Sequence, residues 1–385
     1  REDISRLGDF ADASAEQVQK ARETRGEIEE SLEQVRARFD ILAASRIDDE
    51  IDTDAVSDTS FEDVTELPSY KRAQEVLEST DPLHFPAAFP EVFDGDSSGF
   101  DVIVGNPPWE KTQIERHEFW GRYHPGLRGV SQREREIIMD DLETERPDLA
   151  AEFERLKDAE EKRGKILTNG PYPGIGKSHP DLYKAFSWRF WNLVNRDGDV
   201  GVVLPRSCFI GPGMEQFRRR VLDEGEVLDL TFLKNKAGWV FDGVEPRYTI
   251  ALFSFHRTRS STDPELPIRG PYDDAQSYEK AMEQNPYRFP AERAKKWGGT
   301  ATIPLLPDDL RSVDVFDTLE GHTFIGDDSA EWYPVPYQEL NATQDKKADD
   351  GTRIMHMIED PPDSYWPVYK GESFNIWTPR AGSVY

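Results

Sequence analysis

The sequence predicts an α/β fold, because strand-like runs and helical patterns alternate along its middle. Four short apolar runs have the length of buried strands, and they span residues 100–104, 200–204, 227–233 and 248–255. Helical spacing of apolar residues occupies residues 181–194 and 214–222, between the first three runs. Such alternation is typical of a largely parallel sheet with helices on its faces. Ligands of such sheets bind at the carboxyl ends of the strands.

The first of these strands ends in a polar and aromatic segment. Residues 100–109 read Phe-Asp-Val-Ile-Val-Gly-Asn-Pro-Pro-Trp, and Gly105 interrupts the strand pattern. Pro107 and Pro108 lack backbone N–H groups, so nearby carbonyl oxygens stay free to accept from a ligand. Asn106 adds a side-chain carbonyl, and Trp109 adds a flat apolar face. Together they suit an exocyclic amine on a planar ring, although Asn-Pro-Pro alone is also a turn signal.

This segment resembles the catalytic motif of N6-adenine DNA methyltransferases, in particular type IIG restriction–modification enzymes and related phage-defence methylases. The resemblance implies a Rossmann-like class I S-adenosylmethionine-dependent fold, with the C-terminal part of the sheet in this chain. The implied catalytic residues are Asn106, Pro107, Pro108 and Trp109. A flipped-out adenine would stack on Trp109 and donate its amino hydrogens to Asn106 and the Pro107 carbonyl. Catalysis would then depend on positioning and electrostatics.

The resemblance also implies site residues on two later segments. Asp181 has the residue type of a helix N-cap. By resemblance, Phe186 would touch the adenine ring of S-adenosylmethionine, and Asp181 and Tyr183 would shape that cofactor pocket. A helix with Tyr183 and Phe186 as core aromatics is the alternative. Phe241 matches the position of a second aromatic on the flipped adenine, with a simple core phenylalanine as the alternative.

No glycine-rich turn of the kind that binds S-adenosylmethionine precedes Asn106. A helical pattern fills residues 12–45 instead, and similar methylases carry a helical insertion between the glycine-rich and catalytic motifs. We therefore expect the first strands of the sheet upstream of residue 1. The predicted divisions are a helical segment (1–80), a catalytic core (81–259) with a helical insertion (about 110–166), and a linker with the start of a target-recognition region (260–385).

Smaller elements are predicted around this core. They are an acidic loop at 48–66, a helix at 69–79, an irregular aromatic approach at 81–93, a helix at 132–162, a turn at 196–199 and a recognition-region start at 366–377. Basic residues of the insertion either meet DNA phosphates or form a solvated face; they are Arg116, Arg122, Arg128, Arg133 and Arg135. The strongest local basic cluster is Arg218, Arg219 and Arg220.

Composition limits the other classes of function. The net charge is −28, from 47 basic and 75 acidic residues. This balance is unusual for a DNA-binding protein, so we interpret the dispersed acids as adaptation to a salty, halophilic cytoplasm. Cys208 is the single cysteine and the 7 histidines are scattered, so neither disulfides nor a metal site is expected. No apolar run approaches the ~20 residues of a membrane span, so we expect a cytoplasmic protein without a membrane partner.

The sequence therefore predicts a site-specific adenine methyltransferase whose partners are double-stranded DNA and further subunits of a defence system. Two alternatives remain open. The same fold and motif could act on RNA or on a protein amide, because any planar amine or amide fits the acceptor cluster. The chain could also be a non-catalytic DNA-binding scaffold subunit of a defence complex, since the glycine-rich motif is missing.

Overall fold

The structure is a computed structural model that describes residues 15–57, 63–93, 98–176, 180–246 and 248–305, with short pieces beyond. The chain forms two compact units, Arg1–Phe316 and Asp317–Tyr385. In the second unit the described strands are β7 (Phe374–Asn375) and β8 (Thr378–Pro379), which pair antiparallel. Most of the predicted recognition-region start at 366–377 lies outside the described residues.

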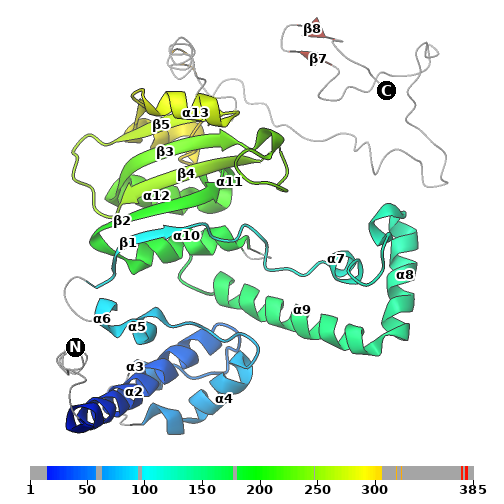
Figure 1. Ribbon diagram of the computed structural model, residues 1–385, viewed down its shortest axis with the longest axis vertical. Helices are drawn as coiled ribbons and strands as arrows, with labels where there is room; N and C mark the ends of the chain where they lie inside the picture. The colour runs from blue at the N-terminus through cyan, green and yellow to red at the C-terminus, as the bar shows by residue number, and fades with distance from the viewer. Residues whose placement is uncertain are drawn as a thin grey trace. The chain divides into compact units, whose positions relative to one another are not determined.

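The first unit contains a six-stranded mixed sheet with the order β1-β2-β4-β3-β5-β6 (Figure 1). Its strands are β1 (Phe100–Gly105), β2 (Val194–Pro205), β3 (Glu226–Lys234), β4 (Thr249–His256), β5 (Glu265–Tyr272) and β6 (Tyr287–Pro290). β1 and β2 are parallel, and β4 runs antiparallel between β2 and β3. The carboxyl ends of β1, β2 and β3 therefore lie at the same end of the sheet. The predicted α/β fold is confirmed, and the run predicted at residues 248–255 forms the antiparallel strand β4.

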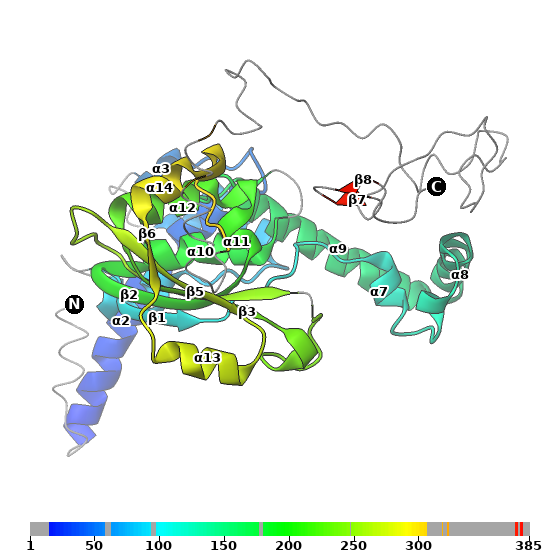
Figure 2. The same ribbon diagram turned by 90° about the horizontal axis from the view of Figure 1, so that it is seen from above.

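Helices cover both faces of this sheet (Figure 2). One face carries α10 (Leu182–Leu193), α11 (Ser207–Ile210), α12 (Glu215–Glu224) and α14 (Ala291–Lys296). In the chain, η3 (Pro212–Met214) lies between α11 and α12, and η5 (Trp297–Gly299) follows α14. The other face carries α13 (Ala275–Met282). The buried core is rich in aromatic side chains, including Trp188, Trp191, Phe209, Phe217, Phe232, Phe253 and Phe255. The loop from β3 to β4 includes the short helix η4 (Lys236–Gly238).

β1 is an edge strand, so the prediction that it is buried is wrong. Val102 and Val104 are 61% and 81% exposed, whereas Ile103 packs against the core. β1 pairs with β2 on one side and with no other described strand. Alternate side chains of a strand point to opposite faces, and the face with Val102 and Val104 is open within the described residues. An apolar run in the sequence does not distinguish an edge strand from a central one.

The predicted turn at residues 196–199 lies inside β2. Phe100 pairs with Val194 but Val102 pairs with Asp199, so the extra residues of β2 bulge out of the ladder. Asn195 fixes the bulge, because its Oδ1 accepts from the Asp197 amide at 2.9 Å and its Nδ2 donates to Asp101 at 2.7 Å. The turn residues therefore form a bulge within a strand rather than a connection between elements.

Two strands lie in the stretch predicted as a linker. β5 is parallel to β3, and β6 is antiparallel to β5, so both belong to the same sheet as β1. The prolines of this stretch, Pro267, Pro271 and Pro290, obscured the strand pattern in the sequence. The division of the whole chain into domains stays a prediction.

The residues before β1 are largely helical. α2 (Ala15–Ala44) and α4 (Pro68–Leu77) confirm two predicted helices and share a buried core. Between them, in the stretch predicted as an acidic loop, lie the short helices α3 (Asp54–Ser57) and η1 (Val64–Glu66). The stretch predicted as irregular forms two single turns, α5 (Phe85–Ala88) and α6 (Pro90–Phe93), each with a proline in its first turn. Aromatic rings at these turns pack around the Phe100 ring at centroid distances of 5.4 to 6.1 Å.

The insertion after β1 has its own small core around Phe119, Trp120 and Phe153. Its helices are α7 (Arg116–Trp120), η2 (Leu127–Gly129), α8 (Gln132–Glu145) and α9 (Pro147–Thr168). The prediction of a single helix at 132–162 is wrong, because Pro147 disfavours helical backbone at Arg146, whose φ and ψ are −126° and 68°. None of the described helices combines the length and apolarity that crossing a membrane requires.

Candidate active site

A pocket of about 370 Å³ lies where β1 ends, and its size is in the range of small-molecule sites. Its lining residues are Asn106, Pro107, Pro108, Trp109, Phe241 and Val244. The four predicted catalytic residues follow β1, whereas Phe241 and Val244 belong to the loop between β3 and β4. The fold therefore brings together two segments that the sequence analysis had linked by resemblance alone.

The Asn-Pro-Pro-Trp segment offers hydrogen-bond acceptors with few competing donors. Asn106 and Pro108 are exposed, while Pro107 is buried. The Asn106 side chain makes no hydrogen bond within the described residues, so its amide is available to a ligand. The two prolines contribute carbonyl oxygens but no N–H groups. This arrangement can accept hydrogen bonds from an amino group at the mouth of the pocket.

Aromatic side chains form the apolar walls. The Trp109 and Phe241 rings are nearly perpendicular, at 85°, with centroids 6.5 Å apart. Tyr248, which the sequence analysis did not select, lies 6.4 Å from Trp109 and is 50% exposed. Two rings in edge-to-face contact form a corner rather than a parallel slot. A planar ligand could stack on Trp109 with its edge toward Phe241.

The indole nitrogen of Trp109 has an unusual position. Its Nε1 is buried and has no hydrogen-bond partner within the described residues. Leaving a buried donor unsatisfied costs about 1–3 kcal/mol. Trp109 packs against the main core, so apolar contact offsets this cost. Trp109 therefore contributes the shape and the face of its ring to the pocket, and its N–H contributes no hydrogen bond to the described residues.

The predicted cofactor residues lie on and just before α10. The backbone after Trp109 runs beside them, because Lys111 bridges to Asp181 and the Leu182 amide donates to the Glu110 carbonyl at 2.8 Å. Asp181 occupies the N-cap position, but its carboxylate pairs with Lys184 at 2.8 Å instead of capping the helix.

Tyr183 and Phe186 differ in exposure. Tyr183 is buried, its hydroxyl accepts a hydrogen bond from Ser207 Oγ at 2.9 Å, and burial raises its pKa. The Phe186 ring is 37% exposed and contacts Phe190, which in turn approaches Gly105. None of the three predicted cofactor residues lines the Asn106 pocket. Their role in cofactor binding stays a prediction.

The cluster Arg218, Arg219 and Arg220 is structural rather than a free basic surface. Arg218 is buried and donates to the carbonyls of Cys208, Gly211, Thr300 and Ala301, each at 2.8 Å. Arg219 pairs with Glu215 and also donates to the Gly299 carbonyl. Arg220 pairs with Glu224. Their spacing in the sequence did not reveal these partners.

The arginines of the insertion divide into two groups. Arg116 contacts Glu136, Asp140 and Glu143 at 2.6 to 3.0 Å. Arg135 donates to the carbonyls of Leu127 and Val130, and Arg128 pairs with Glu118 at 3.7 Å. Arg122 and Arg133 are exposed and form no ion pair with a described residue. These two remain available for phosphate contacts.

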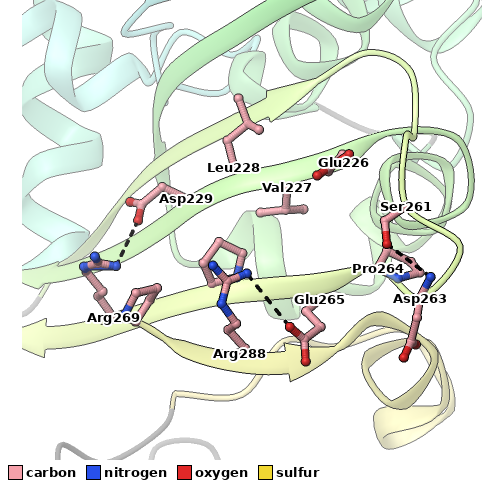
Figure 3. A pocket seen from close by; sticks show the side chains of 12 residues that line it. Glu226, Val227, Leu228, Asp229, Ser261, Asp263, Pro264, Glu265, Arg269 and Arg288 are labelled. Carbon is pink, nitrogen blue, oxygen red and sulfur yellow. Dashed lines mark hydrogen bonds and ion pairs between the residues drawn. The ribbon is translucent and has the colours of Figure 1, made fainter. Parts of the chain in front are cut away.

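A second pocket of about 460 Å³ lies along β3 and β5 (Figure 3). It is polar, and its side chains pair with each other: Arg269 with Asp229 at 3.5 Å, and Arg288 with Glu265 at 3.9 Å. It shares no lining residue with the Asn106 pocket. Because its arginines are neutralised by acids, it offers no ready site for a phosphate.

Part of this chain matches the model of a known methylase family. Residues 28–133 match the family model described as Eco57I restriction-modification methylase. This region includes β1 and the Asn-Pro-Pro-Trp segment. The match supports a restriction–modification methylase. No significant match was found among curated proteins.

Solved structures give partial similarities. A chain of a type I restriction–modification system is 14% identical, with 58% of this chain and 42% of that chain covered and a TM-score of 0.33. A modification subunit of a putative type I restriction enzyme from Vibrio vulnificus YJ016 is 13% identical, with 59% and 41% covered and a TM-score of 0.32. A chain of the DrdV–DNA complex is 15% identical, with 53% and 17% covered and a TM-score of 0.30. The matched region thus spans about two fifths of each of the first two structures.

Proposed function

We propose that this chain carries the catalytic part of a DNA methyltransferase that methylates N6 of a flipped-out adenine in a restriction–modification or phage-defence system. The observation that carries the proposal is the shared pocket of Asn106, Pro107, Trp109 and Phe241. It joins free acceptors for an amino group to an apolar face for a planar base. Adenine presents both features, because its exocyclic amine is attached to a flat ring.

Each residue has a distinct part in the proposed reaction. The adenine ring stacks on Trp109, and the edge of Phe241 limits how far the base can slide. The N6 amino group donates to the Asn106 side-chain carbonyl and to the Pro107 carbonyl. These two acceptors orient the nitrogen lone pair and stabilise the positive charge that develops on nitrogen as it is methylated. No group of the protein has to act as a nucleophile.

S-adenosylmethionine is the proposed cofactor. When bound it would supply the methyl group: the bond from N6 to the methyl carbon would form as the sulfonium C–S bond breaks, S-adenosylhomocysteine would leave, and one N6 proton would pass to water. Phe186 offers a partly exposed ring for its adenine, but the described residues before β1 contain no glycine-rich turn. The open edge of β1 fits pairing with a further strand, and the exposed face with Val102 and Val104 fits a further element packed on it. We propose that the remainder of the cofactor site is carried on such a strand.

Double-stranded DNA is the proposed partner. Arg206 directly follows β2, at the sheet edge shared with the end of β1, and it forms no ion pair with a described residue. Its Nε is buried without a hydrogen-bond partner among the described residues. Together with the exposed Arg122 and Arg133, it provides cations for DNA phosphates. These three arginines would attract DNA phosphates locally, although the net charge of the chain is −28.

A methyl-transfer assay on the intact protein tests the proposal. Labelled S-adenosylmethionine would be offered with duplex DNA, structured RNA or a protein extract in turn. We expect label in DNA, and loss of that label by about 10²-fold or more in Asn106→Ala, because one charge-stabilising acceptor is removed. Asn106 is exposed, so the variant should unfold at the same temperature as the wild type. Label only in RNA or protein, or full activity of the variant, would overturn the proposal.

A further inference from the structure

The loop between β3 and β4 presents Phe241 and Val244 to the catalytic pocket, yet it has little regular structure. Its backbone turns sharply, with positive φ at Ala237 (57°), Gly238 (74°) and Gly243 (74°). Positive φ is unfavourable for a residue with a Cβ such as Ala237. Something must therefore hold this loop in place if Phe241 is to keep its position.

Asn235 lies at the start of the loop and is fully buried. Its Nδ2 donates to the Phe241 carbonyl at 3.0 Å and to the Val244 carbonyl at 3.1 Å. Its Oδ1 accepts from the Val240 amide at 3.2 Å and from the Phe241 amide at 3.0 Å. Both donors and both acceptor positions of the amide are thus used, and every partner is loop backbone.

No other side chain reproduces this set of contacts. Aspartate has the same size but lacks the two donors, so its carboxylate would face the carbonyls of Phe241 and Val244. Glutamine carries the same amide on a longer stem, which a fully buried position cannot accommodate without rearrangement. The backbone amide of Asn235 also donates to the Tyr248 carbonyl at 3.1 Å, which closes the base of the loop.

We propose that Asn235 is the positioning residue of the active site, which holds the Phe241 ring beside Trp109 so that a planar base can be seated. The inference rests on the proposed function for its catalytic consequence. The anchoring itself concerns the free protein and can be measured without substrate. Asn235 does not touch the base; it acts through the Phe241 wall.

Hydrogen exchange in the free protein tests the anchoring. In Asn235→Ala we expect the amides of Val240 and Phe241 to lose about tenfold or more in protection, because their acceptor is removed. Asn195→Ala is the matched control, since Asn195 is also a buried asparagine but lies in the β2 bulge. Asn235→Leu, which is similar in size and also removes the acceptor of the Val240 and Phe241 amides, replaces Asn235→Ala if that variant does not fold. Unchanged protection at Val240 and Phe241 would refute the anchoring even if methyl transfer is confirmed.

A double-mutant cycle tests the catalytic consequence. If Asn235 acts through Phe241, the kcat/KM of Asn235→Ala/Phe241→Ala should equal that of Phe241→Ala within about twofold, because the second change removes nothing more. A parallel binding experiment uses duplex DNA in which 2-aminopurine replaces the target adenine. The fluorescence of 2-aminopurine should increase when the wild-type protein binds, and it should not increase with Asn235→Ala. If the loss of kcat/KM in the double variant instead equals the product of the losses in the two single variants, the inference is overturned. A wild type without methyl transfer or fluorescence change would instead overturn the proposed function.

Discussion

At the scale of single residues, the face of Trp109 matters more than its nitrogen, because Nε1 is buried without a partner among the described residues. Trp109→Phe keeps an aromatic face and removes the unsatisfied donor, so we expect methyl transfer within about tenfold of the wild type. Trp109→Ala should lose about 1–3 kcal/mol of stacking energy. Kinetic measurement of kcat/KM for both variants tests this. Equal losses in the two variants would contradict this account, because a phenyl face would then give no advantage over the absence of a ring.

Cys208 is the second residue with a clear expectation. Burial raises the pKa of its thiol to about 12. The native protein should therefore react with a thiol reagent at about pH 8 only through unfolding, and its rate should follow the unfolding equilibrium. The folded state favours the protonated thiol, so this contribution to stability is complete below about pH 9 and is lost as the pH rises toward 12. Rapid labelling of the native protein would contradict this account of Cys208.

The residues of the site were predictable to different degrees. Asn106, Pro107, Pro108 and Trp109 are contiguous, so their motif is visible in the sequence and the pocket contains all four. Tyr248 and Asn235 could not be found this way. Their roles depend on how the β3–β4 loop folds back on itself, and no local spacing rule encodes that path.

At the scale of elements, Arg218 connects α12 to the residues that follow α14. It donates to four backbone carbonyls while its own side chain is buried. Arg218→Ala should lower the free energy of unfolding by about 3–5 kcal/mol, because buried carbonyls lose a charged donor. Urea denaturation measures this difference.

Arg220→Ala provides the matched control on the same helix. Arg220 and its partner Glu224 are both close to half exposed, so the pair should contribute about 0–1 kcal/mol. A similar loss of stability in the two variants would mean that the carbonyl contacts of Arg218 are not what holds α12 in place.

Elements inside the sheet were predictable from apolar runs, but their surroundings were not. β3 and β4 appear where the sequence predicts them. The exposure of β1 depends on which strand lies beside it, and a run of Val and Ile gives no information on that neighbour. The break between α8 and α9 was readable in principle, because Pro147 sits at the first turn of α9.

At the scale of the whole molecule, the excess of acidic residues should affect the stability of the fold. Acidic residues outnumber basic residues by 75 to 47, so most surface repulsion is between carboxylates. Raising KCl from about 0.1 M to about 1 M shortens the Debye length from about 10 Å to about 3 Å. The temperature of unfolding should therefore increase over this range. A decrease would mean that the ion pairs, such as those of Arg116, stabilise the protein more than the repulsion destabilises it.

The central claim is that the Asn106 pocket presents the amino group of adenine for methylation, and nucleoside analysis tests it most directly. Duplex DNA treated with the intact protein and S-adenosylmethionine would be digested and its nucleosides identified by mass spectrometry. The account predicts N6-methyldeoxyadenosine from the wild type, and its absence with Asn106→Ala at unchanged folding. Methylated cytosine in place of methylated adenine, or the same yield of N6-methyldeoxyadenosine from the variant, would contradict it.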